Sequence, residues 1–307
     1  MTQLYVGIDV SKAWIDVSTP NHPPHRIPCE DLGAFAKRIA ARNAIAVFEA
    51  TGRHDRPLRA ALEAQAVSYV RLSPKAPKTL AKVLGIKAKS DQGDAALLRL
   101  YAETFKPAPT PAVPAQTQAL KDLIARRKQL VLIRQAEKIR AQEPMPEPVR
   151  HSISQIIEIC SQQIRELETM IAARIAGADT QASTYHRLQT APGIGPVTAA
   201  LLIAALPELG RCDRREIAAL AGLAPFDNDS GKWRGRRFIR GGRAEITQAI
   251  YSAAMHASRG NGPLKPFRDR LIAAGKPTKV AIVATARKLL TILNAMMRDQ
   301  KDFQSPA

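Results

Sequence analysis

The sequence predicts an α/β domain, then a helical, coiled-coil-like connector, then a mainly α C-terminal domain. Short apolar runs alternate with helical periodicities up to Phe105, which is typical of an α/β domain. The proline-rich segment Lys106–Pro114 separates this part from two long basic and apolar stretches. From about Asp179 onward, helical patterns are separated by glycines. We therefore expect domains at residues 1–106, 107–178 and 179–307.

The elements of the first domain follow from periodicity and flanking residues. Leu4–Val10 and Trp14–Ser18 are predicted strands, and the tight polar link Ser11–Lys12 favours a hairpin between them. Asp31–Arg42 has helical spacing with an acidic residue at its start. A strand, a helix, a strand and a helix are then expected at Ala44–Glu49, Pro57–Ala66, Val67–Leu72 and Gly93–Phe105.

The connector is predicted to be an antiparallel helical hairpin. Leucines and isoleucines recur at helical spacing in Gln116–Gln142 and Ile153–Ile175, among many basic residues. Prolines between the two stretches, at positions 144, 146 and 148, place the turn. The hairpin is either a dimerisation stalk or a packed spacer, and the intermolecular role is the preferred interpretation.

Composition indicates a polyanionic partner. The 307 residues carry a formal net charge of +19, and 45% of them are hydrophobic, so a folded core and a strongly basic surface are both expected. Nucleic acid is preferred over a basic solubility surface or an anionic membrane. No apolar run reaches the roughly 18–20 residues of a membrane span, and no secretory pattern opens the chain. The cysteines, Cys29, Cys160 and Cys212, fit neither a disulfide framework nor a zinc site, which predicts a cytoplasmic protein.

Four acidic residues form the candidate catalytic site. Asp9 ends the first predicted strand in GIDVSK, and Glu49 ends another apolar run in VFEATG. Asp91 and Asp94, in KSDQGDA, are spaced so that both carboxylates share one helical face. Ligands collect at strand ends in an open α/β sheet, so these side chains are expected to converge. We call them the acidic quartet.

The quartet predicts a Mg²⁺ site. Four close carboxylates repel one another unless hard cations lie between them, and Mg²⁺ prefers oxygen ligands. Two such ions can hold the attacking and leaving oxygens in phosphoryl transfer. Singly, each aspartate is more often a turn or cap residue, and Asp91 is a candidate N-cap. The order of strand Asp, strand Glu and helical Asp-x-x-Asp is more specific and resembles the RNase H-like (RuvC-like) fold of Holliday-junction resolvases.

The C-terminal domain contains a predicted phosphate-binding turn. In Leu188–Leu206, a Pro-Gly-Ile-Gly-Pro turn between apolar helical stretches fits a helix-hairpin-helix. Gly193 and Gly195 would let the backbone approach a phosphate, and Pro196 suits the first turn of the next helix. A plain helical corner without a ligand is the alternative, and nucleic-acid backbone contact is preferred.

A basic, glycine-rich loop with aromatic residues follows that turn. Trp233 and Phe238 are interleaved with cations in a manner that suits a nucleic-acid surface. Ser230, in Asp-Ser-Gly, heads this run; a serine there is usually a turn residue, and becomes a nucleophile only when its proton is removed and charge is stabilised. The candidate binding residues are Lys232, Arg234, Arg236, Arg237, Arg240 and Arg243.

Together these motifs resemble the DEDD-type transposases of the insertion-sequence 110 family. GIDVSK, FEATG and KSDQGDA are similar to the family's resolvase-like domain, and PGIGPVTA with GLAPFDNDSGKWRGRRFIRGGRAEI is similar to its transposase domain. The resemblance covers nearly the whole chain in the family's order. It implies a bacterial, nucleoid-associated DNA recombinase.

The resemblance also implies specific roles. Asp9, Glu49, Asp91 and Asp94 would bind Mg²⁺, and Ser230 would attack the DNA backbone to form a transient phosphoserine link. A bridge RNA would pair with donor and target DNA and guide the reaction. The assembly would be a dimer to tetramer with active sites shared between subunits. Two alternatives remain: a metal-dependent nuclease with water as nucleophile, and a binding protein whose quartet does no chemistry.

Overall fold

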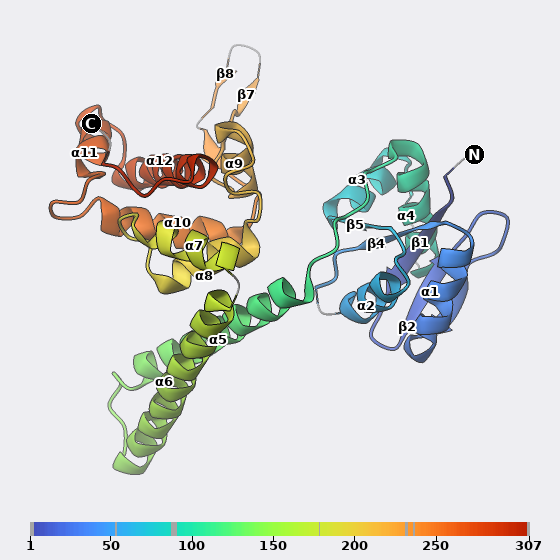
Figure 1. Cartoon of the computed structure of the whole chain (residues 1–307), viewed down its shortest axis with the longest axis horizontal. Coiled ribbons are helices and arrows are strands. Elements are labelled where there is room, and N and C mark those ends of the chain that lie inside the picture. Colours follow the sequence, from blue (N-terminus) through green and yellow to red (C-terminus); the bar gives the residue numbers. More distant parts are fainter. Residues whose placement is uncertain are drawn as a thin grey trace. The chain divides into compact units, whose positions relative to one another are not determined.

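The computed structural model describes residues 3–52, 54–86, 91–177, 179–230, 233–235 and 237–305. For five of these the backbone alone is described: Asp179, Thr180, Asp229, Ser230 and Arg234. The chain forms two compact units, Met1–Val113 and Pro114–Ala307, here called the N-terminal and C-terminal units (Figure 1). The helical connector belongs to the second unit, and its status as a domain of its own remains a prediction.

The N-terminal unit is built on a five-stranded mixed sheet with the order β3-β2-β1-β4-β5. Strands β1, β4 and β5 are parallel, whereas β2 and β3 are antiparallel additions beside β1. The predicted first hairpin is confirmed; strand β3 was not predicted. The strands are β1 (Tyr5–Val10), β2 (Trp14–Ser18), β3 (His25–Pro28), β4 (Ile45–Glu49) and β5 (Tyr69–Leu72).

Helices cover both faces of this sheet. On one face, Phe35 of α1 and Leu58 of α2 pack against Ile8 and Phe48. On the other face, α4 packs through Leu98 and other apolar residues. A short helix, α3, was not predicted; Pro77 is its one buried residue, so it carries little apolar periodicity. The helices are η1 (Cys29–Asp31), α1 (Leu32–Ala41), α2 (Arg56–Ala64), α3 (Lys75–Val83) and α4 (Asp91–Phe105).

The proline-rich segment closes the N-terminal unit along β5. The backbone N–H of Thr110 donates to the carbonyl of Tyr69 at 2.7 Å, and its hydroxyl accepts from the N–H of Arg71 at 2.8 Å. These bonds satisfy backbone groups at the edge of the sheet. The prolines therefore mark a boundary that packs on the first unit.

The C-terminal unit opens with the predicted antiparallel helical hairpin, α5 (Ala115–Arg140) and α6 (Glu147–Ala176). Its open end packs on α8 through Leu120 and Ile175, and its middle holds Leu130 against Cys160 and Ile164. Pro148 lies in the first turn of α6, where its missing N–H removes no helical hydrogen bond.

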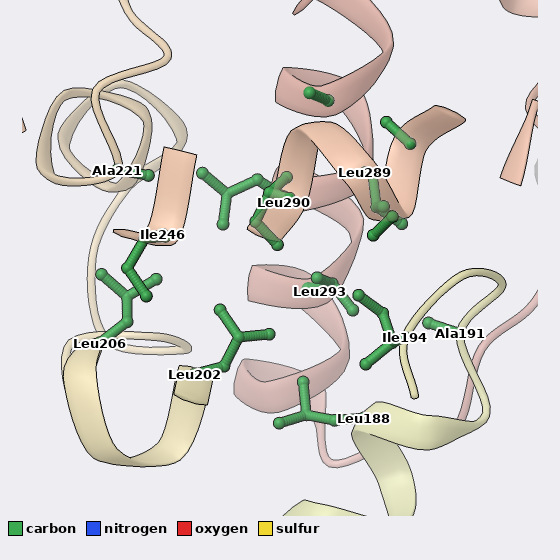
Figure 2. Packing of buried hydrophobic residues seen from close by; sticks show 14 of the residues in the cluster. Leu188, Ala191, Ile194, Leu202, Leu206, Ala221, Ile246, Leu289, Leu290 and Leu293 are labelled. Atoms are coloured by element: carbon green, nitrogen blue, oxygen red, sulfur yellow. The ribbon is translucent and has the colours of Figure 1, made fainter. Parts of the chain in front are cut away.

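The remaining helices except α11 pack around one apolar cluster, to which α12 contributes Leu289, Leu290 and Leu293 (Figure 2). Helix α12 is long and apolar enough to cross a membrane, but half of its apolar window is buried in the unit, as in a core helix. The helices are α7 (Asp179–Gln189), α8 (Pro196–Ala205), α9 (Arg214–Leu220), α10 (Ala244–Ala257), α11 (Lys265–Ala273) and α12 (Thr278–Asp299).

The basic segment after α9 is a β-hairpin, so the predicted glycine-rich loop is wrong over these residues. Strand β6 (Pro225–Phe226) pairs with β9 (Phe238–Ile239), and β7 (Asp229–Ser230) pairs with β8 (Trp233–Arg234), both antiparallel. Each strand has only two residues, so the alternation that marks a strand in a sequence is too short to detect.

Candidate metal centre and nucleic-acid interface

Two carboxylates of the quartet leave the sheet on the same face. Asp9 lies near the end of β1, and Glu49 is the last residue of the parallel neighbour β4. The register pairs Gly7 with Val47, so Asp9 and Glu49, two residues further on, share their face. That face is the one that α4 covers. The two strand ends thus present their acids toward α4.

A glycine sets the distance between α4 and the sheet. A Cβ on Gly7 would stand 2.0 Å from the carbonyl oxygen of Ala95 and 2.6 Å from the backbone nitrogen of Arg99. The helix backbone therefore rests directly on β1 at this point. Asp91 and Asp94 lie in the first turn of the same helix, immediately before Ala95. Gly7 thereby brings the helical half of the quartet down to the strand ends.

The electrostatics show that the acids converge on Asp9. Partial burial, followed by the charges of Asp94, Asp91, Asp16 and Glu49, raises the pKa of Asp9 to about 6. Acidic residues in a first helical turn also stabilise the helix, so Asp91 and Asp94 alone would not indicate a site. The nearness of Asp91 and Asp94 to the strand residues Asp9 and Glu49 does indicate a site, because like charges repel one another. The other three quartet residues therefore lie near enough to Asp9 for their charges to act on it.

The donor set fits a hard divalent cation, although the carboxylates are not closed around a point. Within the described ranges, no three acidic, histidine or cysteine side chains stand as close as a bound metal requires. The side chain of Asp91 is 57% exposed and contacts Arg26. Uncompensated carboxylates hold one another apart, and a cation between them removes that repulsion. The four candidate ligands are all carboxylates, whose oxygens suit Mg²⁺. None of the four is a cysteine or histidine, the ligands that structural zinc sites usually contain.

Two further charged residues, Asp16 and Arg26, belong to this site and were missed in the sequence. Asp16 is the cross-strand partner of Asp9, and Arg26 is the cross-strand partner of Asp16. Arg26 donates to both carboxylate oxygens of Asp16, at 3.1 and 2.9 Å. The available signal was a lone acid in an otherwise apolar strand, WIDVS, but its position opposite Asp9 depends on the strand register.

In the C-terminal unit, the Pro-Gly-Ile-Gly-Pro turn is exposed at its glycines and anchored by Ile194, which lies in the core cluster (Figure 2). Gly193 has a φ of 78°, and a Cβ there would meet the carbonyl oxygen of Ala253 at 2.2 Å. The backbone of Gly193 therefore lies directly against α10. Gly195 precedes α8 in open space and offers no side-chain cap, so first-turn N–H groups remain directed outward. Phosphate binding at this turn remains a prediction.

Ser230 lies on the β-hairpin opposite Trp233, its cross-strand partner. The backbone of Ser230 is described and its side chain lies outside the described part. The indole of Trp233 is 58% exposed and lies over Gly235, where a Cβ would meet the ring at 2.4 Å. Gly235 also donates its N–H to the carbonyl of Asn228 at 3.2 Å. An exposed aromatic ring is thus fixed beside the candidate nucleophile.

The predicted basic contacts divide by their surroundings. Arg240 stacks over Phe226 at 4.8 Å, and Arg237 forms an exposed ion pair with Asp227 at 2.7 Å. Both remain on the surface of the hairpin. Lys232 and Arg236 lie outside the described residues, as does the side chain of Arg234.

Arg243 differs from the other arginines because its charge is already paired. Its two terminal nitrogens each donate to Glu208 at 2.6 Å, and one also donates to the carbonyl of Ala205. This ion pair holds the pKa of Glu208 below its usual value. The structure gives Arg243 an anchoring role at the base of the hairpin, and its contact with nucleic acid remains a prediction.

Comparison with known proteins places the chain beside transposases in both units. Residues 6–147 match the DEDD transposase model of IS110, and residues 185–268 match the model described as the transposase IS116/IS110/IS902 family. The first match contains all four quartet positions, and the second contains the helix-hairpin-helix turn and the β-hairpin.

Similar proteins include DNA-rearranging and insertion-element proteins. The pilin gene-inverting proteins of Moraxella bovis and Moraxella lacunata are each 28% identical over 324 residues, covering 99% of this chain and 98% of theirs. An uncharacterized 43.6 kDa protein of the insertion element IS110 from Streptomyces coelicolor is 30% identical over 38% of this chain and 30% of its own length.

Proposed function

Because this chain belongs to the IS116/IS110/IS902 family of transposases, we propose that it breaks and rejoins DNA through Ser230, with Mg²⁺ ions held by Asp9, Glu49, Asp91 and Asp94. As a family member it is a DNA recombinase that carries out phosphoryl transfer. Its DEDD domain indicates a divalent metal. The identity of the metal, the serine nucleophile and the guide RNA are the proposal.

The observation that carries the proposal is the crowding of acids around Asp9. Negative side chains from β1, β4 and α4 meet on one face of the sheet, in a chain of net charge +19. Repulsion at that point costs folding free energy in the metal-free protein. A cation bound between these acids would offset their repulsion, which supports a metal site at this point. Bound Mg²⁺ would polarise the scissile phosphate and stabilise the charge that develops on its oxygens.

The serine step is a substitution at phosphorus. The Oγ of Ser230 attacks the scissile phosphate and forms an Oγ–P bond, while the bond from phosphorus to one deoxyribose oxygen breaks. The serine proton is lost to a base, and the leaving oxygen takes up a proton to become a free hydroxyl. Attack by the hydroxyl of another strand reverses the step, rejoins DNA and restores the serine. No phosphodiester bond is lost.

The partners follow from charge and from the relatives. The basic, aromatic hairpin and the net charge of +19 suit donor and target DNA together with a bridge RNA. The full-length relatives are named for inverting a pilin gene, which supports site-specific rearrangement as this chain's reaction class. A homo-oligomer in the bacterial cytoplasm completes the proposal.

A suicide DNA substrate tests the nucleophile. The parent protein should form a covalent protein–DNA adduct in Mg²⁺, visible as a shifted band on a denaturing gel. Ser230→Ala should abolish the adduct, and Asp9→Asn should abolish it with Ser230 intact. An adduct that persists in Ser230→Ala would refute the serine assignment.

The competing function is a nuclease with water as the nucleophile. It predicts cleaved DNA with no adduct from the parent and unchanged cleavage by Ser230→Ala. The RNA requirement is tested separately by activity after complete RNase treatment, which should disappear and return when the RNA transcribed from the flanking element is added. Unchanged recombination in cells by Asp9→Ala would instead favour a binding protein without chemistry.

A further inference from the structure

A fifth carboxylate, outside the predicted quartet, stands opposite Asp9. Asp16 is the cross-strand partner of Asp9, so the two side chains share a face of the sheet. Asp16 is only 1% exposed, and its charge contributes to the raised pKa of Asp9. A buried carboxylate beside a metal site is expected to serve as a ligand or to be neutralised. The structure neutralises it.

The neutralising group is Arg26 on the edge strand β3. Its Nε and Nη2 donate to the two oxygens of Asp16 at 3.1 and 2.9 Å, a bidentate geometry that fixes the guanidinium plane. The guanidinium also lies over the indole of Trp14 at 4.2 Å. Nη2 then reaches the carboxylate of Asp91 at 3.4 Å. A cation held by Asp16 thus touches a quartet member.

The two contacts of Arg26 are unequal in strength. Asp16 is fully buried, whereas Asp91 is 57% exposed and meets Arg26 at the longer distance. A long ion pair between exposed groups contributes little, and a buried carboxylate depends strongly on its partner. Asp16 therefore determines where the guanidinium lies, and Asp91 is contacted only as a consequence. The quartet retains its negative charge although an arginine stands beside it.

We propose that Arg26 is a positioning residue for the metal centre, held by Asp16 so that it borders Asp91 without neutralising the quartet. This inference rests on the proposed metal site. Released from Asp16, the guanidinium would pair with the quartet and compete with the cation. Without Arg26, the negative charge of Asp16 would instead add to the site. The two partners of one ion pair therefore act on metal binding in opposite directions.

The test is metal titration of the full-length protein in the absence of nucleic acid. Mg²⁺ alone is followed by thermal unfolding, and Mn²⁺ alone by electron paramagnetic resonance. Asp16→Asn should raise the metal concentration at half-saturation by roughly three- to tenfold, and Arg26→Gln should lower it by a similar factor. The double variant should return close to the parent. Arg26→Lys keeps the charge but loses the bidentate geometry. This variant should raise the metal concentration at half-saturation, as Asp16→Asn does.

A matched control separates this role from a structural one. Asp55 is another buried, ion-paired aspartate of the same unit, held by Arg59 at 3.2 Å and Arg71 at 2.7 Å, and it is not one of the four acids whose charges raise the pKa of Asp9 most. Asp55→Asn should lower the melting temperature and leave the half-saturation concentration unchanged. If Asp16→Asn and Arg26→Gln behave like Asp55→Asn, the inference is wrong.

The same titration distinguishes this inference from the proposed function. Metal binding by the parent with no shift in the variants overturns the role of Arg26 alone. Failure of the parent to bind either metal overturns the metal centre and the inference with it. If Asp16→Asn does not fold, the double variant and Arg26→Lys still test the role of Arg26, because a half-saturation concentration is predicted for each of them.

Discussion

At the residue scale, the proposed metal ligand Asp9 is expected to lower the stability of the metal-free fold. Its pKa is raised to about 6 because burial and neighbouring acids disfavour the charged form. The folded state therefore binds more protons than the unfolded state between the ordinary aspartate pKa of 3.8 and about 6. The free energy of unfolding falls as pH rises through that window, and the loss is complete above it.

Asp9→Asn is expected to stabilise the metal-free protein. In EDTA at pH 7.5, thermal unfolding should show a gain on the order of 1 kcal/mol, after allowance for solvent screening. The gain should shrink toward zero as pH falls to the ordinary range of a carboxyl. Added Mg²⁺ should reverse the order, because only the parent retains the full donor set.

The control for this prediction is Asp31→Asn, an exposed acid at the start of α1. Asp31→Asn should give no comparable gain in the free energy of unfolding in EDTA at pH 7.5, because the side chain of Asp31 is exposed. A metal-free Asp9→Asn protein that is less stable than the parent at pH 7.5 would contradict the electrostatic account of the quartet.

Trp233 carries the second prediction at this scale. An exposed ring fixed over Gly235 is suited to stacking on a base. Trp233→Ala should weaken binding to single-stranded DNA by about 1–3 kcal/mol, measured by fluorescence anisotropy. Trp233→Phe should keep most of the affinity. Equal affinities for the parent and the alanine variant would exclude a stacking role.

At the element scale, α4 is placed by backbone contact, and this supplies a third prediction. Gly7→Ala would force the helix away from β1, because the obstacles are backbone atoms of α4 that cannot rotate aside. We expect a loss of at least about 1–3 kcal/mol in unfolding free energy, together with weaker Mn²⁺ binding.

Gly33→Ala is the matched control for Gly7→Ala. Gly33 lies in α1, where an added Cβ meets nothing within 4 Å. This substitution should stabilise the protein by roughly 0.5–1 kcal/mol, since alanine favours a helix. Equal behaviour of the two alanine variants would show that Gly7 does not set the position of α4.

Periodicity predicted elements whose apolar face is long enough and missed those without one. Helices α1, α2 and α4 and the connector hairpin each bury a regular stripe, and all were expected. Strand β3 has one buried residue in four, and α3 has one in nine. The β-hairpin of Ser230 consists of two-residue strands. Such elements depend on tertiary pairing, which a linear pattern does not contain.

The site followed a similar rule. The places of the quartet were predictable because strand ends and a helix start are visible in the sequence, whereas the role of the quartet stays a prediction. Asp16 and Arg26 were not predictable, because their importance arises from the register of three strands. The close approach of Gly193 to Ala253 was not predictable either, because it depends on how α10 packs, and the contact of Gly193 with phosphate stays a prediction.

At the scale of the whole molecule, the quartet and Ser230 lie in different compact units. A site made from both can combine units of different protomers, as the family resemblance implies. We expect a mixture of Asp9→Asn and Ser230→Ala proteins to recover part of the covalent adduct that neither forms alone. Covalent adduct formed by the mixed proteins on a suicide substrate provides the measurement. No recovery at any mixing ratio would mean that each active site is built within one chain.

Gly7 is also a position where most substitutions are expected to inactivate the protein. No single-base change at a glycine codon yields a smaller side chain, so every substitution places atoms where α4 now rests. In a mutagenised library selected for lost recombination, position 7 should therefore tolerate as few replacements as Asp9, although glycine has no side chain with which to bind a metal. Loss of recombination would then map to this packing position as well as to the proposed metal ligands.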